Sequence, residues 1–132
     1  MTDELEEIRA QKREKMMNED AEEEQGTVAK PVRVESAAHL DELVGSHDVV
    51  LVDFYADWCG PCKMMEPAIQ TVASETEAVV AKVNIDQHQP LAQQNGVRGV
   101  PTLQLYANGE PAQRLVGMQD ESKLRDLIGR YA

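Results

Sequence analysis

Residues 49–62 have the sequence VVLVDFYADWCGPC, and this segment decides the fold of the chain. Its first half, Val49–Tyr55, is an almost continuous apolar run, which is typical of a strand buried on both faces of a sheet. A helix is predicted to follow over residues 59–74. The two cysteines of the chain, Cys59 and Cys62, are therefore expected where a buried strand turns into a helix.

Strand and helix patterns alternate outward from this segment. We expect the other strands at residues 31–34, 78–84, 102–107 and 112–116, and the other helices at residues 36–45, 90–95 and near the C-terminus. Asn108-Gly109, between the last two strands, is a strong β-hairpin signal. Alternation of strands and helices requires parallel crossovers, and a hairpin requires an antiparallel edge. The predicted fold class is therefore α/β, a mixed central sheet of five strands flanked by helices on both faces.

The composition limits the classes of function. A length of 132 residues with 42% apolar residues suits a single core. No stretch approaches the ~20 apolar residues that cross a bilayer, and the charged N-terminus lacks the apolar segment of a signal peptide. We therefore expect a cytoplasmic protein that does not bind a membrane. The net charge of −11 disfavours nucleic acid as a partner, because phosphate binding needs clustered lysine and arginine.

The acidic charge is concentrated at the N-terminus, where ten of the 24 acidic residues fall within residues 1–25. Such a composition cannot bury enough apolar surface to offset the entropy lost on ordering. We expect residues 1–29 to form a charged extension, mobile or partly helical, ahead of a domain at residues 30–132. The extension is either a solvated tail or a docking segment for a partner. The overall acidity fits either ordinary solubility or a cytoplasm of high salt.

The C-x-x-C pair is better suited to a chemical role than to a structural disulfide. A disulfide with two intervening residues closes a very small ring, so it removes little entropy from the unfolded chain and stabilises the fold little. At a helix N-terminus, unpaired N–H groups and the helix dipole stabilise a thiolate. This predicts a lowered pKa for the Cys59 thiol, which makes it the nucleophile. Cys62, one turn further along and less exposed, is the resolving thiol. Gly60 leaves room for a substrate chain, and Pro61 fits the first helical turn.

Asp53 is the candidate base for the resolving thiol. A carboxyl inside an otherwise apolar strand is costly to ionise, so its pKa should be raised toward neutrality, where proton transfer is effective. The alternative is a structural carboxylate paired with a cation such as Lys82, which also lies within an apolar strand. The two interpretations are compatible if Lys82 tunes Asp53.

Residues 52–63, VDFYADWCGPCK, resemble the active-site segment of the thioredoxin family. The resemblance extends over residues 30–132 through further matches, namely Pro67, KVNID at 82–86, VRGVPT at 97–102, NG at 108–109 and Gly117. It implies the thioredoxin fold and a redox-active disulfide between Cys59 and Cys62. The chain departs from the family at Tyr55, where many members have tryptophan, and in its acidic extension.

The resemblance also implies roles for individual residues. Cys59 corresponds to the attacking thiol, Cys62 to the resolving thiol and Asp53 to the buried carboxylate. Pro101 corresponds to a cis-proline that faces the sulfurs and frees the backbone of Val100 to pair with an extended substrate. The residues expected to form a flat apolar contact patch are Trp58, Gly60, Pro61, Val100, Gly117 and Met118.

We therefore expect a protein-disulfide reductase that keeps the thiols of cytoplasmic client proteins reduced. The family implies a monomer without a bound cofactor that receives electrons from NADPH through a thioredoxin reductase, although a ferredoxin-linked donor stays open. The alternatives are a disulfide isomerase or oxidant of the same fold, and a binding or chaperone module. A metal site is disfavoured because the cysteines supply two of the usual four zinc ligands, and no histidine has ligand spacing; the histidines are His39, His47 and His88.

Overall fold

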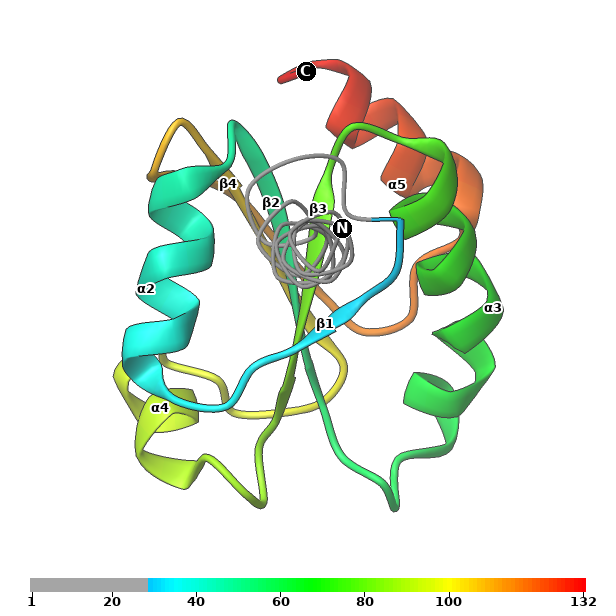
Figure 1. Cartoon of the computed structure of the whole chain (residues 1–132). Helices are drawn as coiled ribbons and strands as arrows, with labels where there is room; N and C mark the ends of the chain where they lie inside the picture. The colour runs from blue at the N-terminus through cyan, green and yellow to red at the C-terminus, as the bar shows by residue number, and fades with distance from the viewer. Residues whose placement is uncertain (1–28) are drawn as a thin grey trace, which may run out of the picture.

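A mixed five-stranded sheet with the strand order β1-β3-β2-β4-β5 forms the centre of the structure (Figure 1). The computed structural model describes residues 29–132. The elements are β1 (Val32–Arg33), α2 (Ala37–Ser46), β2 (Val49–Tyr55), α3 (Gly60–Glu75), β3 (Val79–Asn84), α4 (Gln89–Gln94), β4 (Thr102–Ala107), β5 (Glu110–Val116) and α5 (Glu121–Gly129). This order and the mixed sheet confirm the predicted α/β fold.

Strand β2 is the central strand, and all seven of its residues are buried. It pairs in parallel with β3, as the predicted crossovers require, and antiparallel with β4; the predicted hairpin accounts for the antiparallel pairing of β4 with β5. The hairpin from β4 to β5 turns at Asn108 and Gly109, which both have positive φ, at 53° and 82°. Positive φ at both central residues gives the turn a twist that matches the flanking strands.

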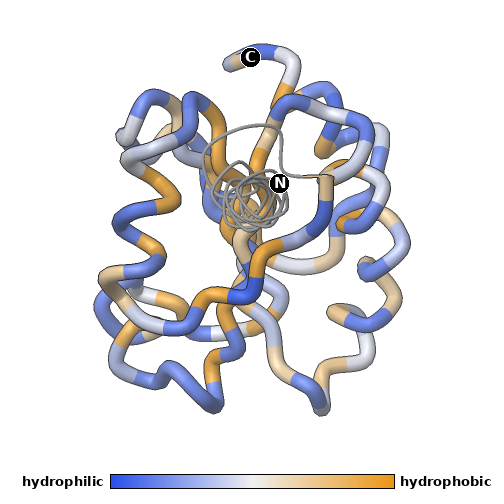
Figure 2. Tube along the Cα trace, viewed as in Figure 1, coloured by the Kyte–Doolittle hydropathy of each residue, from blue (hydrophilic) through white to orange (hydrophobic). Residues whose placement is uncertain are grey.

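Helices cover both faces of the sheet, with α2 and α4 on one side and α3 and α5 on the other (Figure 1). Two separate apolar clusters result. On the α2 side Leu40 and Leu43 pack with Phe54, and on the α3 side Met65 packs with Leu51. In Figure 2 the hydrophobic colour gathers in the central strands, whereas the helices alternate between hydrophobic and hydrophilic residues, as amphipathic helices do.

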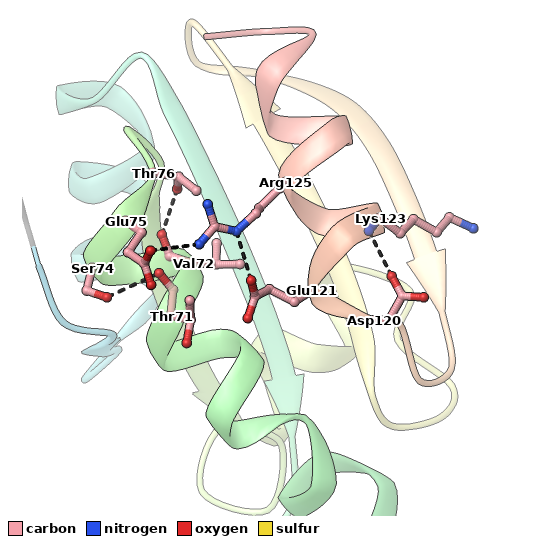
Figure 3. Close-up of polar contacts among 9 residues, drawn as sticks. All are labelled: Thr71, Val72, Ser74, Glu75, Thr76, Asp120, Glu121, Lys123 and Arg125. Atoms are coloured by element: carbon pink, nitrogen blue, oxygen red, sulfur yellow. Dashed lines mark hydrogen bonds and ion pairs between the residues drawn. The ribbon is translucent and has the colours of Figure 1, made fainter.

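The C-terminal end of α3 is tied to α5 by polar contacts (Figure 3). The Arg125 guanidinium lies 3.0 Å from a carboxylate oxygen of Glu75 and donates a 2.9 Å hydrogen bond to Glu121. Asp120 caps the N-terminus of α5 by accepting from the Lys123 N–H at 2.8 Å. Exposed ion pairs of this kind contribute little each, so the apolar packing beneath them does most to hold α3 on the sheet.

Some helix ends differ from the predicted ones by a residue or two. The sequence predicts that the first helix stops at Gly45, but α2 continues to Ser46, because the cap residue His47 is extended and needs no left-handed glycine. The apolar periodicity places Tyr131 on the C-terminal helix, but this residue lies beyond α5, where it still packs against the core.

The expectations for residues 1–28 lie outside the described residues. Within residues 29–132, no helix combines the length and apolar content needed to cross a membrane.

Candidate active site

The two cysteines lie where β2 leads into α3. Strand β2 ends at Tyr55, and Cys59 is the N-cap of α3 rather than its first helical residue. Cys59 and Cys62 form a disulfide, with their Cα atoms 5.3 Å apart. The Sγ atom of Cys59 accepts a hydrogen bond from the Cys62 backbone N–H at 3.1 Å. The first sulfur therefore occupies the position at which a helix N-terminus stabilises negative charge.

Both cysteines are buried, with exposed fractions of 4% for Cys59 and 6% for Cys62. The expectation that Cys62 is the less exposed of the two is therefore wrong for the disulfide form. In this form the Cys59 sulfur lies at the first turn of the helix, bonded to Cys62 and accepting from the Cys62 N–H, which leaves little of it exposed.

The segment around Pro101 lies against the cysteine turn. The Val100–Pro101 peptide bond is cis, and Val100 packs against the small cluster that contains Cys59 and Cys62. The Pro101 carbonyl accepts a 2.9 Å hydrogen bond from the Gly117 N–H, which holds the residue after β5 next to the Pro101 segment. Gly117 has a φ of 91°, a conformation that favours glycine. The fold thus unites three segments that are far apart in the chain.

Large apolar side chains are exposed on these same segments, with exposed fractions of 68% for Trp58 and 50% for Met118. Gly60 and Pro61 are exposed, while Val100 and Gly117 are half-buried. Trp58 belongs to the cysteine turn and Met118 follows Gly117, and neither side chain is buried in the core.

Two further exposed apolar residues, Met64 and Val116, were not singled out by the sequence analysis. Met64 lies in the first turns of α3, and Val116 is the last residue of β5. The available sequence signal for Met64 was a large apolar residue two positions after Cys62 in the predicted helix.

A buried amide fixes the turn before the cysteines. Asn84, the last residue of β3, is 4% exposed, and its Oδ1 accepts from the Asp86 N–H at 2.9 Å. Its Nδ2 donates to Asp57 at 3.4 Å, and the Trp58 indole N–H donates to Asp86 at 2.9 Å. Sequence reasoning missed this network. The available signal was a polar residue at the end of an apolar strand.

Asp53 lies in the middle of β2 and is 4% exposed. Its Cα is aligned with Lys82 on β3 and with Leu103 on β4. Since side chains alternate along a strand, Asp53 faces the same side as Leu51, which packs against α3. Burial raises the pKa of Asp53 to about 7, the charge of Lys82 opposes this rise, and the charge of Glu66 adds to it.

Lys82 pairs with a partner that the sequence analysis did not name. Its Nζ forms a salt bridge with Glu66 on α3 and lies 4.4 Å from the centroid of the Tyr55 ring. Among the described residues, none of the salt bridges joins Lys82 to Asp53. The structural alternative for Asp53, a carboxylate paired with Lys82, therefore lacks its ion pair, although Lys82 still acts on Asp53 through its charge.

The part of the chain from residue 29 onward contains no group of three or more His, Cys, Asp or Glu side chains placed to hold a metal ion. What the site presents is a pair of sulfurs with a buried carboxyl group on the same side of the sheet as α3.

Comparison with known proteins places this geometry in a family. The thioredoxin family profile matches residues 30–130. A thioredoxin from Chlamydia caviae is 40% identical over 102 residues, which cover 76% of this chain and 99% of that protein. A bifunctional thioredoxin reductase/thioredoxin from Mycobacterium leprae is 38% identical over 99 residues, covering 73% of this chain and 22% of that protein.

Solved structures agree. A mutant thioredoxin from Halobacterium salinarum NRC-1 is 52% identical, with a TM-score of 0.76, over 78% of this chain and 91% of that chain. A thioredoxin from Fasciola hepatica is 34% identical, with a TM-score of 0.71, over 76% of this chain and 99% of that one. The chain therefore belongs to the thioredoxin family and is a thiol–disulfide oxidoreductase, a protein-disulfide reductase that works through the redox-active Cys59/Cys62 pair and needs no bound cofactor.

Proposed function

We propose that Cys59 is the attacking thiol of this reductase and that Cys62 is the resolving thiol. One observation carries the assignment: the Cys59 sulfur caps the N-terminus of α3 and accepts the Cys62 N–H at 3.1 Å. In the reduced protein the same N–H group and the helix dipole favour a thiolate on Cys59. Cys62 lies inside the helix, where it is placed to attack Cys59 from one turn away.

The reaction consists of two thiol–disulfide exchanges. The Cys59 thiolate attacks one sulfur of a client disulfide, the client S–S bond breaks, and the other client sulfur leaves as a thiolate. Cys62 then gives up its proton and attacks the Cys59 sulfur of the mixed disulfide. The Cys59–client bond breaks, the second client thiolate leaves, and the Cys59–Cys62 disulfide forms. The client gains two electrons and the dithiol pair loses them.

Asp53 is the proposed acceptor of the Cys62 proton. A pKa of about 7 means that the carboxyl is close to half ionised near neutral pH, so it can take up a proton and later release it. Asp53 faces the side of the sheet that α3 covers, and Cys62 lies in the first turn of that helix. Lys82 is proposed to tune this carboxyl through its charge.

The client is proposed to bind on the exposed apolar patch beside the disulfide. This patch comprises Trp58, Gly60, Pro61, Val100, Gly117 and Met118, and the buried Pro101 is proposed to support it from beneath. Exposed apolar side chains that border a reactive group are typical of a protein-binding surface. An extended client segment would pair with the backbone of Val100, as a peptide pairs with the edge of a sheet.

The electron donor is proposed to be a thioredoxin reductase that uses NADPH. The support is the family together with the Mycobacterium leprae relative, whose name joins a thioredoxin reductase and a thioredoxin. We further propose that the protein acts in the cytoplasm as a monomer, and that residues 30–132 form the thioredoxin domain while residues 1–29 form an extension to it.

Disulfide reduction assays with insulin and dithiothreitol test the two cysteine roles. Cys59→Ser should lose the activity, because no thiolate remains to attack the client. Cys62→Ser should lose turnover but accumulate a mixed disulfide through Cys59, because nothing resolves it. Full activity in either variant would overturn the dithiol mechanism, and trapping through Cys62 instead of Cys59 would reverse the two roles.

A further inference from the structure

The Lys82 ammonium is held on the α3 side of the sheet by a residue that lies outside the family motif quoted above. That residue is Glu66, whose carboxylate forms the salt bridge with Lys82. The Lys82 side chain is 15% exposed and that of Glu66 is 37% exposed, so the pair lies partly shielded from solvent. Lys82 also sits over the Tyr55 ring, with its Nζ 4.4 Å from the ring centroid. The ammonium therefore has two contacts, the Glu66 carboxylate and the Tyr55 ring, and neither is the carboxyl of Asp53.

Glu66 acts on Asp53 in two ways. An ammonium near a buried carboxyl favours the ionised form, whereas a second carboxylate disfavours it. Glu66 holds the Lys82 ammonium on α3 through the salt bridge, and it adds a negative charge of its own. Among the described residues, the charges that act on Asp53 come from Lys82 on β3 and Glu66 on α3. The neighbour on β4, Leu103, is apolar, and the two cysteines do not titrate while they are bonded.

We propose that Glu66 is a positioning residue of this reductase, which by holding the Lys82 ammonium sets the pH range over which Asp53 can accept the proton of Cys62. The inference rests on the proposed role of Asp53 as the base and deepens it. The proton still moves from the Cys62 thiol to the Asp53 carboxylate. Glu66 exchanges no proton in this step.

The direct test is a carbon-13 NMR titration of the Asp53 carboxyl in the oxidised full-length protein, in which the disulfide matches the structure. Glu66→Gln removes the negative charge and releases the Lys82 ammonium, so both effects favour the Asp53 carboxylate. The midpoint of the titration should fall by about half to one pH unit. An unchanged midpoint would overturn the proposal.

The matched control is Glu75→Gln on the same helix. Glu75 is an exposed carboxylate that pairs with Arg125, and it is not among the charges that shift the pKa of Asp53. Its removal should leave the Asp53 midpoint where it is in the unmodified protein. An equal shift in both variants would show that any loss of acidic charge moves the titration, which would also overturn the proposal.

A double-mutant cycle with Lys82→Gln separates positioning from simple repulsion. If Glu66 acts through Lys82, the shift caused by Glu66→Gln should be smaller in the Lys82→Gln background. Equal shifts in both backgrounds would contradict the positioning role and leave only direct repulsion between Glu66 and Asp53.

The proposed base role has its own separate readout. If Asp53→Asn reduces insulin at the unmodified rate, the base role of Asp53 fails, while the titration still reports whether Glu66 controls that carboxyl. If Asp53→Asn is impaired, Glu66→Gln should move the pH profile of mixed-disulfide resolution toward lower pH, by the amount that the titration shows.

Discussion

Asp53 is a carboxyl group in the middle of the apolar strand β2, and burial is the main cause of its raised pKa of about 7. Between the ordinary pKa of 3.8 and this raised value, the folded protein keeps a proton that the unfolded chain has lost. The contribution of this group to stability is therefore present at low pH and is lost as the pH rises through about 7. An acid that costs stability at neutral pH is expected where function requires it.

Asp53→Asn should accordingly stabilise the oxidised protein at high pH. Each pKa unit corresponds to ~1.4 kcal/mol, so the gain in the free energy of unfolding should be about 2–4 kcal/mol above about pH 8. Below about pH 3 the gain should vanish, because Asp53 is then protonated in both states. Guanidinium unfolding at the two pH values measures the difference.

Asp126→Asn is the control for this measurement, since it removes an exposed carboxylate from α5. Its effect on stability should be small at both pH values. A gain from Asp53→Asn that is the same at low and high pH would show that ionisation of Asp53 is not the cause.

At the scale of elements, the turn before the cysteines depends on the end of β3. Asn84 is buried there, and its side-chain oxygen accepts from the backbone N–H groups of Asp86 and Gln87 at 2.9 and 3.3 Å. Its amide reaches across to Asp57 in the cysteine turn. The two loops are thus held together by one side chain that takes no part in the chemistry.

Asn84→Ala should lower the free energy of unfolding by about 1–3 kcal/mol, because it leaves backbone donors without their acceptor. Guanidinium unfolding measures the loss. Asp86→Ala is the comparison, since it removes the exposed hydrogen bond to Trp58 and should cost under about 1 kcal/mol. Equal losses in the two variants would contradict the central part given to Asn84.

Strands and turns that are determined by their own local sequence could be predicted closely. The predicted bounds of strand β2 agree with the structure to the residue, because its apolar run ends abruptly at the turn, and the Asn108-Gly109 hairpin forms as expected. Helix ends could be predicted less well. Gly45 resembles a helix stop, but α2 runs past it since the chain leaves the helix in an extended conformation at His47.

At the scale of the whole molecule, the sheet brings together segments that are distant in sequence, namely the cysteine turn, the Pro101 segment and the end of β5. The resemblance to the thioredoxin family could identify Cys59, Cys62 and Pro101 because these residues belong to contiguous motifs. It could not identify the pairing of Glu66 with Lys82, which depends on how α3 lies over β3. Contacts between elements become visible only when the fold is assembled.

The reductase function depends on the redox equilibrium of the assembled site. The residues between the two thiols, Gly60 and Pro61, carry no charge, so in the proposed mechanism the Cys59 thiolate is stabilised by the helix N-terminus. A strongly stabilised reduced form would make the pair an oxidant. With only this moderate stabilisation of the thiolate, the dithiol gives up its electrons readily, as a reductase requires.

The reduction potential of the Cys59/Cys62 pair, measured by equilibration with a glutathione or dithiothreitol buffer, tests the reductase function most directly. We expect a potential close to the value of about −270 mV known for thioredoxin itself, which we adopt rather than derive. A value at or above about −180 mV, in the range of disulfide isomerases and oxidants, would contradict the account.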